Sequence, residues 1–337
     1  MMLAVSFPKI GKYFMDIISL DKIKQILAGS NSAELLKAIE DGFVMYAEGK
    51  VVVPPVGHLG FTDPPGDVHI KYGRIEGDDH YVIKIASGFY DNPKHGLPPG
   101  NGMMMVFSAK TGEPLAILHD EGVLTDIRTA IAGAVCAKYL APAKITRIGI
   151  VGTGVQARLQ LQYLKAVTDC REVMVWGRSL EKAEAVEKDP GLSDFHIQST
   201  TDVNALASTC NLIVTTTASR EALLMANQVR PGTHITAMGA DAAGKQELDA
   251  ALFAKADIVV ADSIDQCVDH GDIHHAVRAG HLRDDRIISL GDVIKANQQP
   301  ATSNQKHRTS DQQITIADLT GVAIQDIQIA KYVCNKR

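Results

Sequence analysis

The stretch RIGIVGTGVQARLQLQYL, residues 147–164, decides the fold class of this 337-residue chain. Its first five residues form a short apolar run typical of a buried strand, and the residues after the glycines have the spacing of an amphipathic helix. The turn between them reads GxGxxA, in which Gly152 permits a tight bend and Gly154 lets the backbone approach a pyrophosphate. A glycine-rich turn could merely connect two elements, but its flanking strand and helix favour a dinucleotide site. The residues expected to contact the dinucleotide here are Gly152, Thr153, Gly154, Val155, Gln156 and Ala157.

Strand-like and helix-like segments alternate after residue 145, which predicts a parallel α/β sheet of the Rossmann type. The strand-like runs are 147–151, 172–176, 211–216, 234–238 and 257–261. The Ala-rich segment 126–140 precedes them and predicts one helix, with Thr125 as its N-cap and Pro142 beyond its end. We therefore expect a Rossmann dinucleotide-binding domain over residues 126–311.

The N-terminal part has a different pattern. Two helices are expected at 21–28 and 32–48, with Ser32 capping the second. Short β-rich segments separated by Pro, Gly, Asp or Asn follow, which is typical of antiparallel strands. They are 51–53, 68–72, 81–86, 102–108 and 115–119. We expect an α+β domain over residues 1–125, to which the segment 312–337 returns.

The composition favours a protein that acts on small molecules. The formal net charge is −5 and the pI is about 6.2, so nothing predicts binding to nucleic acid or to an anionic membrane. The five cysteines form no CxxC pair, which favours free thiols in a reducing compartment. The N-terminal segment contains Lys9 and Lys12 and no long apolar run. We expect a cytoplasmic protein that is neither exported nor inserted in a membrane.

The end of the strand at 172–176 bears on the choice of cofactor. An NAD-specific fold commonly has Asp or Glu there for the ribose 2′-OH, whereas this chain reads WGRS. Arg178 and Ser179 can meet a 2′-phosphate, so NADP(H) is favoured over NAD(H); alternatively, Arg178 is a solvated loop residue. Thr215 and Thr216 close the strand 211–216 and could line the cofactor, although threonines are common in strands.

Arg128 is the first candidate on the substrate side. It lies early in the predicted helix 126–140, where a cation opposes the helix dipole. A bound anion, such as a substrate carboxylate, would remove that conflict. The alternative is an ion pair with Asp120, Glu121 or Asp126.

Lys84 and Asp241 are further candidates. Lys84 lies in YVIKIASG, a charge in an apolar strand context that could also face solvent on an edge strand. Asp241 directly follows a strand of the nucleotide-binding sheet, the edge where such folds bind ligands. An isolated Asp in a Gly-rich turn can equally be turn chemistry.

Several motifs together resemble one known family, the ornithine cyclodeaminase/mu-crystallin family, over roughly residues 50–335. They are HIKYG, VIKIASGFYDNP, LTDIRTAIAGAVCAKYLA, GTGVQA, MGADAAGKQEL, SLGD and LTGVAIQDIQIA. The family includes ornithine and lysine cyclodeaminases, alanine dehydrogenases and reductases of cyclic or linear imines. Its members are typically dimers that pair through the non-Rossmann domain. The resemblance implies that residues 1–125 and 312–337 form a substrate-binding and dimerisation domain.

The resemblance also implies residue roles. Lys84 matches the family's active-site lysine, Arg128 its substrate-carboxylate arginine, and Asp241 the acid that handles protons near the nicotinamide. Other positions match segments that approach the nicotinamide end, among them Ser289, Gly291 and Val322.

One departure from the family pattern affects the substrate side. A substrate-contacting arginine often follows the Pro near residue 55, where this chain has Val56 and His58. Lys71 or His58 could compensate, or both could be surface residues. The departure disfavours a direct copy of a cyclodeaminase site.

These expectations combine into one activity, the NADPH-dependent reduction of a cyclic 2-imino acid. The substrate would be Δ1-pyrroline-2-carboxylate, giving L-proline, or Δ1-piperideine-2-carboxylate, giving L-pipecolate. Arg128 would hold the carboxylate with help from Lys84 and Lys71, and Asp241 or Lys84 would transfer the proton. The alternatives are a cyclodeaminase using bound NAD, an amino-acid dehydrogenase, and a non-catalytic NADPH-dependent ligand-binding protein.

The histidine group in CVDHGDIHHAVRAGH has spacing that can bind zinc on one helix face. Glycines interrupt the segment, however, and no thiolate or carboxylate pattern follows, so we expect no metal there. Its members are His270, His274, His275 and His281.

Overall fold

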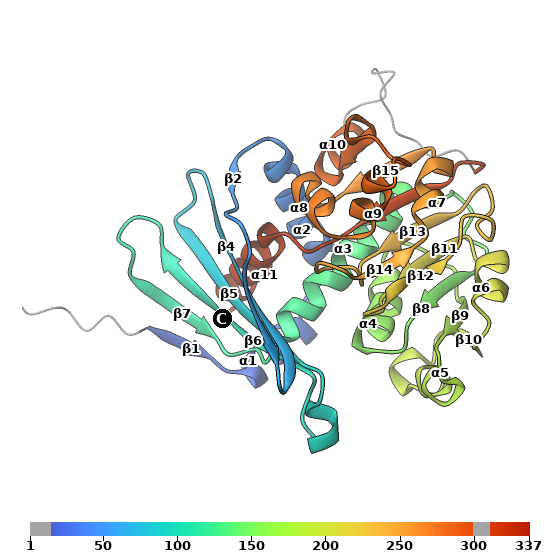
Figure 1. The fold of residues 1–337 in the computed structure, drawn as a ribbon. Helices are drawn as coiled ribbons and strands as arrows, with labels where there is room; N and C mark the ends of the chain where they lie inside the picture. The colour runs from blue at the N-terminus through green and yellow to red at the C-terminus, as the bar shows by residue number, and fades with distance from the viewer. Residues whose placement is uncertain (1–14, 299–310) are drawn as a thin grey trace, which may run out of the picture.

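The computed structural model describes residues 15–298 and 311–337, which form two large sheets with helices between and around them (Figure 1). One sheet is mostly antiparallel and the other is entirely parallel. The expected fold class, an α/β protein with a Rossmann-type sheet beside an α+β region, is confirmed. Residues 1–14, on which the expectation about export rests, lie outside the described residues.

The antiparallel sheet has the strand order β1-β7-β6-β5-β4-β2, with β3 paired to β4. Along β4 the side chains alternate, so that Lys71, Gly73 and Ile75 are buried while Ile70 and Tyr72 are exposed. β3 is a strand that the sequence pattern did not predict. The strands are β1 Asp16–Ile18, β2 Val51–Val52, β3 Gly57–Thr62, β4 Pro65–Ile75, β5 His80–Phe89, β6 Gly100–Ser108 and β7 Pro114–Leu118.

The parallel sheet has the order β10-β9-β8-β11-β13-β17-β15-β16, so the carboxyl ends of its strands meet at one edge. The expected domain boundary at residue 312 is wrong for β17, which lies in the middle of this sheet. The strands are β8 Ile148–Val151, β9 Glu172–Trp176, β10 His196–Thr200, β11 Leu212–Thr215, β13 His234–Ala237, β15 Ile258–Ala261, β16 Ile287–Ser289 and β17 Thr315–Asp318. A separate pair is formed by β12 Arg220–Leu224 and β14 Gln246–Leu248.

Helices flank the parallel sheet and also separate it from the antiparallel one. Figure 1 shows α3, Val123–Leu140, between the two sheets, and α11, Ala323–Asn335, beside the antiparallel sheet. The other helices are α1 Leu20–Ala28, α2 Ser32–Ala47, α4 Val155–Leu164, α5 Leu180–Glu187, α6 Val203–Thr209, α7 Ala250–Lys255, α8 Ile264–Asp269, α9 Asp272–Arg278 and α10 Leu290–Gln298. In the described part of the chain, no helix is long and apolar enough to cross a bilayer.

Two predicted helix caps are wrong. The N-cap of α3 is Gly122, with φ of 88°, so the helix begins before Thr125. Asn31 rather than Ser32 caps α2, because its side chain accepts the backbone N–H of Ala33 at 2.9 Å. At α2, Asn31 and Ser32 are adjacent residues that are both suited to cap a helix, so the sequence does not decide between them.

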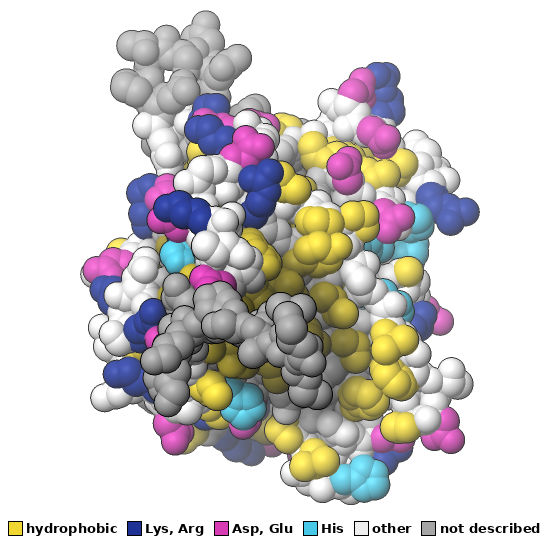
Figure 2. Space-filling model, turned by 90° about the vertical axis from the view of Figure 1, so that its left-hand side faces the viewer, with side chains coloured by type: hydrophobic (Ala, Val, Ile, Leu, Met, Phe, Trp, Pro, Cys, Tyr) yellow, Lys and Arg dark blue, Asp and Glu magenta, His cyan; other side chains and the backbone are white. Residues whose placement is uncertain are grey.

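The face of the antiparallel sheet that points away from the parallel sheet carries exposed apolar side chains. They include Ile17 on β1, Leu59 on β3, and Ile70 and Tyr72 on β4. Figure 2 shows hydrophobic side chains gathered on this side of the molecule. Contiguous exposed apolar surface of this kind marks a site of association.

Candidate active site

The glycine turn between β8 and α4 has the geometry that a dinucleotide requires. Gly152 has φ of 134°, and a Cβ there would lie 2.4 Å from Thr216 Oγ1. Gly154 caps α4 without a side-chain hydrogen bond, and among the described residues nothing lies within 4 Å of the position of a Cβ. The first N–H groups of α4 are therefore free to bind an anion.

An arginine holds the turn in place from behind. The Nη1 group of Arg158 donates to the backbone oxygens of Thr153 at 2.9 Å and of Gly154 at 3.2 Å. Its Nε group pairs with Asp189 at 2.8 Å. On the next strand, Arg178 is exposed and makes no ion pair with any described residue, while Ser179 Oγ caps α5. The turn and this strand end thus fit a dinucleotide with a free guanidinium near its ribose.

Several predicted cofactor contacts have other roles in the structure. Thr215 is fully buried, and its hydroxyl donates to Glu247 at 2.6 Å, so its side chain does not face the open edge. Gly291 lets α10 approach α2, because a Cβ there would lie 2.1 Å from the backbone oxygen of Phe43. Val322 is fully buried at the start of α11.

Two other predicted contacts are engaged with neighbouring side chains. Ser289 donates its hydroxyl to Asp292 at 2.7 Å. Gln156 donates to the backbone and side-chain oxygens of Asp126 and so links α4 to α3. Thr216 lies beside the turn, where its Oγ1 limits position 152 to glycine.

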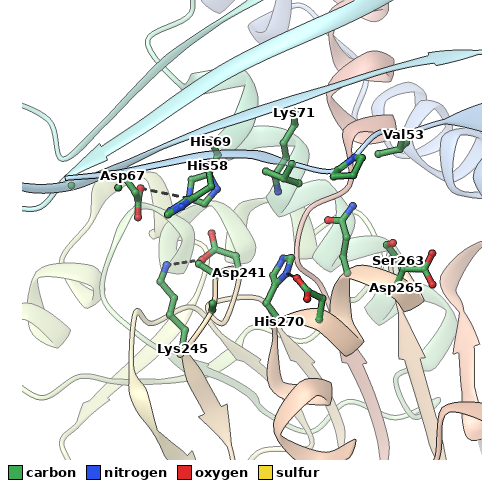
Figure 3. Close-up of a pocket in the computed structure, with 18 of the residues that line it drawn as sticks. Val53, His58, Asp67, His69, Lys71, Asp241, Lys245, Ser263, Asp265 and His270 are labelled. Carbon is green, nitrogen blue, oxygen red and sulfur yellow. Dashed lines mark hydrogen bonds and ion pairs between the residues drawn. The ribbon is translucent and has the colours of Figure 1, made fainter. Parts of the chain in front are cut away.

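A cavity of about 800 Å³ lies between the antiparallel sheet and the carboxyl edge of the parallel sheet. Figure 3 shows its two walls, one formed by β3 and β4 and the other by segments that follow β13 and β15. The first wall carries His58, Asp67, His69 and Lys71, and the opposite wall carries Asp241, Lys245, Ser263, Asp265 and His270.

Strand register explains why these side chains meet. Asp67, His69 and Lys71 alternate along β4 and therefore share one face of the sheet. His58 on β3 pairs directly with His69, and Lys84 on β5 pairs directly with Lys71. Five polar residues thus line one face of three adjacent strands.

Lys84 and Arg128 converge on a carboxylate that the sequence did not reveal. Lys84 Nζ lies 2.9 Å from Asp326 Oδ2, and Arg128 Nε lies 3.0 Å from Asp326 Oδ1. Arg128 Nη1 also donates to Gln325 Oε1 at 2.8 Å. The predicted alternative partners of Arg128, at positions 120, 121 and 126, are not its partners. The carboxylate comes from α11 instead.

Lys71 belongs to the same cluster. A Cβ at Gly321 would lie 2.8 Å from Arg128 Nη1 and 3.2 Å from Lys71 Nζ, so the two cations are neighbours. Lys71 also donates to the backbone oxygen of Thr320 at 3.0 Å. It lines the cavity, whereas Lys84 and Arg128 lie behind it and are 2% and 5% exposed.

Burial and the charges of neighbouring residues shift the pKa values of these groups. Burial, and then the charge of Arg128, lower the pKa of Lys84 to about 7 and also lower the pKa of Lys71. Burial acts to raise the pKa of Asp326, but the nearby cations, Lys84 foremost, hold it below its usual value. Lys84 and Arg128 contact one carboxylate and Lys71 lies beside Arg128, so basic groups predominate at the end of the cavity near Lys71.

Asp241 faces this cluster from the other wall, where its Oδ1 accepts from Lys245 Nζ at 2.6 Å. Its side chain is 49% exposed. Partial desolvation acts to raise the pKa of Asp241, but the charges of Lys245 and Lys71 hold it below its usual value. Burial acts to lower the pKa of Lys245, and Asp241 raises it above its usual value. Asp241 is therefore an ionised carboxylate that can accept a proton or stabilise a cation.

The predicted histidine group is not brought together as a metal site. His274 Nδ1 and His275 Nε2 lie within hydrogen-bond distance of the backbone oxygens of Val268 and Lys245. His270 lines the cavity. Among the described residues, these histidines form no cluster suited to a metal ion.

An anion-binding glycine turn and a charged cavity at the same edge of a Rossmann sheet define a two-domain, nicotinamide-dependent oxidoreductase. The chain belongs to the ornithine cyclodeaminase/mu-crystallin family, whose model matches residues 19–337. The expected family is thereby confirmed.

The relatives span almost the whole chain. An uncharacterised cyclodeaminase of Sinorhizobium fredii is 41% identical over 94% of both chains, and the alanine dehydrogenase of Archaeoglobus fulgidus is 37% identical over 89% of both. A solved archaeal alanine dehydrogenase dimer with bound NAD is 32% identical, with a TM-score of 0.84 over 96% of this chain and 95% of that one. More distant relatives are an iminosuccinate reductase of Paracoccus denitrificans, 32% identical over 92% and 93%, and a Δ1-pyrroline-2-carboxylate reductase of Bacillus thuringiensis, 29% identical over 86% and 88%.

Sequence reasoning missed Asp326 and Lys245. Asp326 had a visible signal, since it is a lone acid in the apolar helix AIQDIQIA, a context that requires a buried partner. Lys245 lies four residues after Asp241, and the turn between them brings the two side chains together.

Proposed function

We propose that the protein uses NADPH to reduce the C=N bond of a cyclic 2-imino acid. The product is L-proline from Δ1-pyrroline-2-carboxylate or L-pipecolate from Δ1-piperideine-2-carboxylate. One observation carries the proposal: a buried cluster of three cations around Asp326 faces the ionised Asp241 across one cavity. A protonated 2-imino acid has matching charges, a carboxylate at one end and an iminium nitrogen at the other.

The substrate carboxylate binds at Lys71, the cation of the cluster that lines the cavity. An ammonium–carboxylate hydrogen bond of this kind is charge-assisted. Arg128 and Lys84, immediately behind, add positive potential in a site from which water is largely excluded. Arg128 therefore adds to this positive potential and helps to position Lys71. The protonation state of Lys84 determines how much of the cluster's positive charge is present near neutral pH.

The iminium nitrogen lies against Asp241. Its N–H donates to the carboxylate, which keeps the imine protonated and its C2 electrophilic. A dihydronicotinamide, when bound, would supply a hydride for C2; the nitrogen would retain its proton, so the product would be a secondary amine. Lys245 keeps Asp241 ionised and oriented through its 2.6 Å hydrogen bond.

The cofactor preference rests on Arg178. Its guanidinium is exposed at the end of β9 without an ion-pair partner among the described residues, and it is suited to bidentate contact with a 2′-phosphate. NADP(H) is therefore proposed as the preferred cofactor.

A second candidate is the reversible reduction of a linear 2-imino acid, that is, an amino-acid dehydrogenase. The cavity of about 800 Å³ has room for a cyclic or a linear imine beside a nicotinamide, so its size does not separate the two candidates. The names of the alanine dehydrogenase and iminosuccinate reductase relatives agree with this candidate. Both candidates use the same carboxylate and nitrogen contacts.

A homodimer and a cytoplasmic location complete the proposal. The exposed apolar face of the antiparallel sheet, including Ile70 and Tyr72, supports pairing through that sheet. The five cysteines are all unpaired, which supports a reducing compartment.

The test is loss of nicotinamide absorbance when purified protein is mixed with NADPH and each imine, compared with the Asp241→Asn variant. We expect turnover by the wild type and at least a hundredfold lower kcat in the variant, with cofactor affinity unchanged. Turnover with linear imines but not with cyclic ones would favour the second candidate, an amino-acid dehydrogenase. Ammonia release from ornithine or lysine with NAD would replace the proposal by a cyclodeaminase, and full activity of the variant would refute the role of Asp241.

A further inference from the structure

The cavity wall on β3 and β4 carries a group of side chains that the proposed reaction does not use. His58, Asp67 and His69 each present one nitrogen or oxygen atom, and these atoms all lie within 4.8 Å of one another. His69 Nε2 is 3.6 Å from Asp67 Oδ1, and the two imidazole centroids are 5.0 Å apart. The residues come from two adjacent strands whose register places them on one face.

We propose that His58, Asp67 and His69 form a binding site for a divalent transition-metal ion such as Zn²⁺. Two imidazoles and one carboxylate are a ligand set that zinc prefers, and three protein ligands leave a coordination position open. The three side chains line the cavity, across from Asp241 (Figure 3). The inference does not depend on the proposed function.

The imidazoles are free to coordinate. Among the described residues, neither His58 nor His69 has a hydrogen-bond partner for its ring nitrogens beyond the 3.6 Å approach to Asp67. A neutral imidazole has a lone pair on one ring nitrogen that can bind a metal ion. A protonated histidine would not bind.

The carboxylate of Asp67 already accepts an outer hydrogen bond of the kind that orients metal ligands. Tyr90 donates its hydroxyl to Asp67 Oδ2 at 2.6 Å, which leaves Oδ1 directed toward His69. Such outer hydrogen bonds orient ligands and are part of most metal sites. Tyr90 therefore acts as a positioning residue for the site.

Asp67 and His69 have to approach each other only slightly to bind one metal ion. Bonds of about 2.0–2.1 Å in tetrahedral geometry place ligand atoms about 3.3 Å apart. Asp67 and His69 are within about 0.3 Å of that separation, given their 3.6 Å distance. His58 is exposed, so its side chain has room to rotate toward the other two ligands.

The experiment is a titration of untagged, chelator-treated full-length protein with Zn²⁺ by calorimetry, and with Co²⁺ by its visible absorption. We expect one saturable site per chain, an intense Co²⁺ spectrum typical of four-coordination, and displacement of Co²⁺ by Zn²⁺. His69→Gln and His58→Gln should each weaken binding at least about tenfold, whereas His281→Gln, at an exposed histidine outside the cavity, should not.

Two results would overturn the inference. One is no saturable binding by the wild type, and the other is binding that is unchanged in both variants, which would place the metal elsewhere. Since His58 is exposed, its variant keeps the test valid even if replacing half-buried His69 disturbs the fold. Unchanged dinucleotide binding by the variants serves as the control for folding.

Discussion

Replacing Asp326 by asparagine tests how the buried charges are balanced. The side chain is 1% exposed, and its two oxygens contact Lys84 at 2.9 Å and Arg128 at 3.0 Å. The variant removes the only carboxylate that contacts these two cations among the described residues. Removing one partner of a buried ion pair costs about 3–5 kcal/mol. Because Lys84 already has a pKa of about 7, it will lose its proton in the variant, which places the expected loss near 3 kcal/mol.

The assay is urea denaturation at neutral pH, followed by circular dichroism. Glu184→Gln is the matched control, because Glu184 pairs with Lys188 on the surface and its loss should cost at most about 0.5 kcal/mol. Adding Lys84→Met to Asp326→Asn should restore about 1–2 kcal/mol, since an apolar side chain replaces the buried amine that has lost its partner. A loss below about 0.5 kcal/mol for Asp326→Asn, or additive losses in the double variant, would refute the reasoning.

Three further predictions address the cofactor and the lysine. Gly152→Ala places a Cβ 2.4 Å from Thr216 Oγ1 at a φ of 134°. A fluorescence titration should therefore show a dinucleotide affinity at least about tenfold weaker than that of the wild type. Unchanged affinity contradicts the fit of the turn to a dinucleotide. Arg178→Ala should raise the KM for NADPH about tenfold and leave the KM for NADH unchanged, with Arg283→Ala as a neutral control; equal effects on both cofactors would contradict the 2′-phosphate contact. Between a pH of about 7 and 10.5, Lys84 is protonated in the unfolded chain but has lost its proton in the native protein. The free energy of unfolding of the wild type, relative to that of Lys84→Met, should therefore rise by up to about 1.4 kcal/mol per pH unit in this range. A stability difference that does not change with pH contradicts the lowered pKa of Lys84.

The sequence predicted the local features of the dinucleotide site correctly. The strand, turn and helix around Gly152 are contiguous, and each has its own signal in hydrophobic spacing or glycine placement. A glycine that a tight turn requires can be recognised from its neighbours in the sequence, so no tertiary contact was needed to find it. The packing roles of Thr215 and Gly291 could not be predicted in the same way. Both residues fit a cofactor motif by type, but their neighbours Glu247 and Phe43, distant in sequence, determine what they do.

The charged cluster could be found only in part. Lys84 and Arg128 stood out as charges in apolar or unfavourable surroundings, and the structure does bury them. Their shared partner Asp326 lies nearly 200 residues after Arg128, and β17 must first cross the parallel sheet before α11 can bring it back. Spacing along a chain contains no information about such a contact. The role of Lys71 as the cation at the cavity wall likewise depends on a strand register that only the folded sheet defines.

The central claim is that this cavity reduces a 2-imino acid at the expense of NADPH. The most direct measurement is the initial rate of nicotinamide oxidation by the purified protein, with NADPH and NADH tested separately against Δ1-pyrroline-2-carboxylate and Δ1-piperideine-2-carboxylate. We expect rapid oxidation of NADPH with at least one of these imines, slower oxidation of NADH, and formation of the matching cyclic amino acid. No oxidation of either cofactor with either imine, under conditions in which the protein binds NADPH, would contradict it.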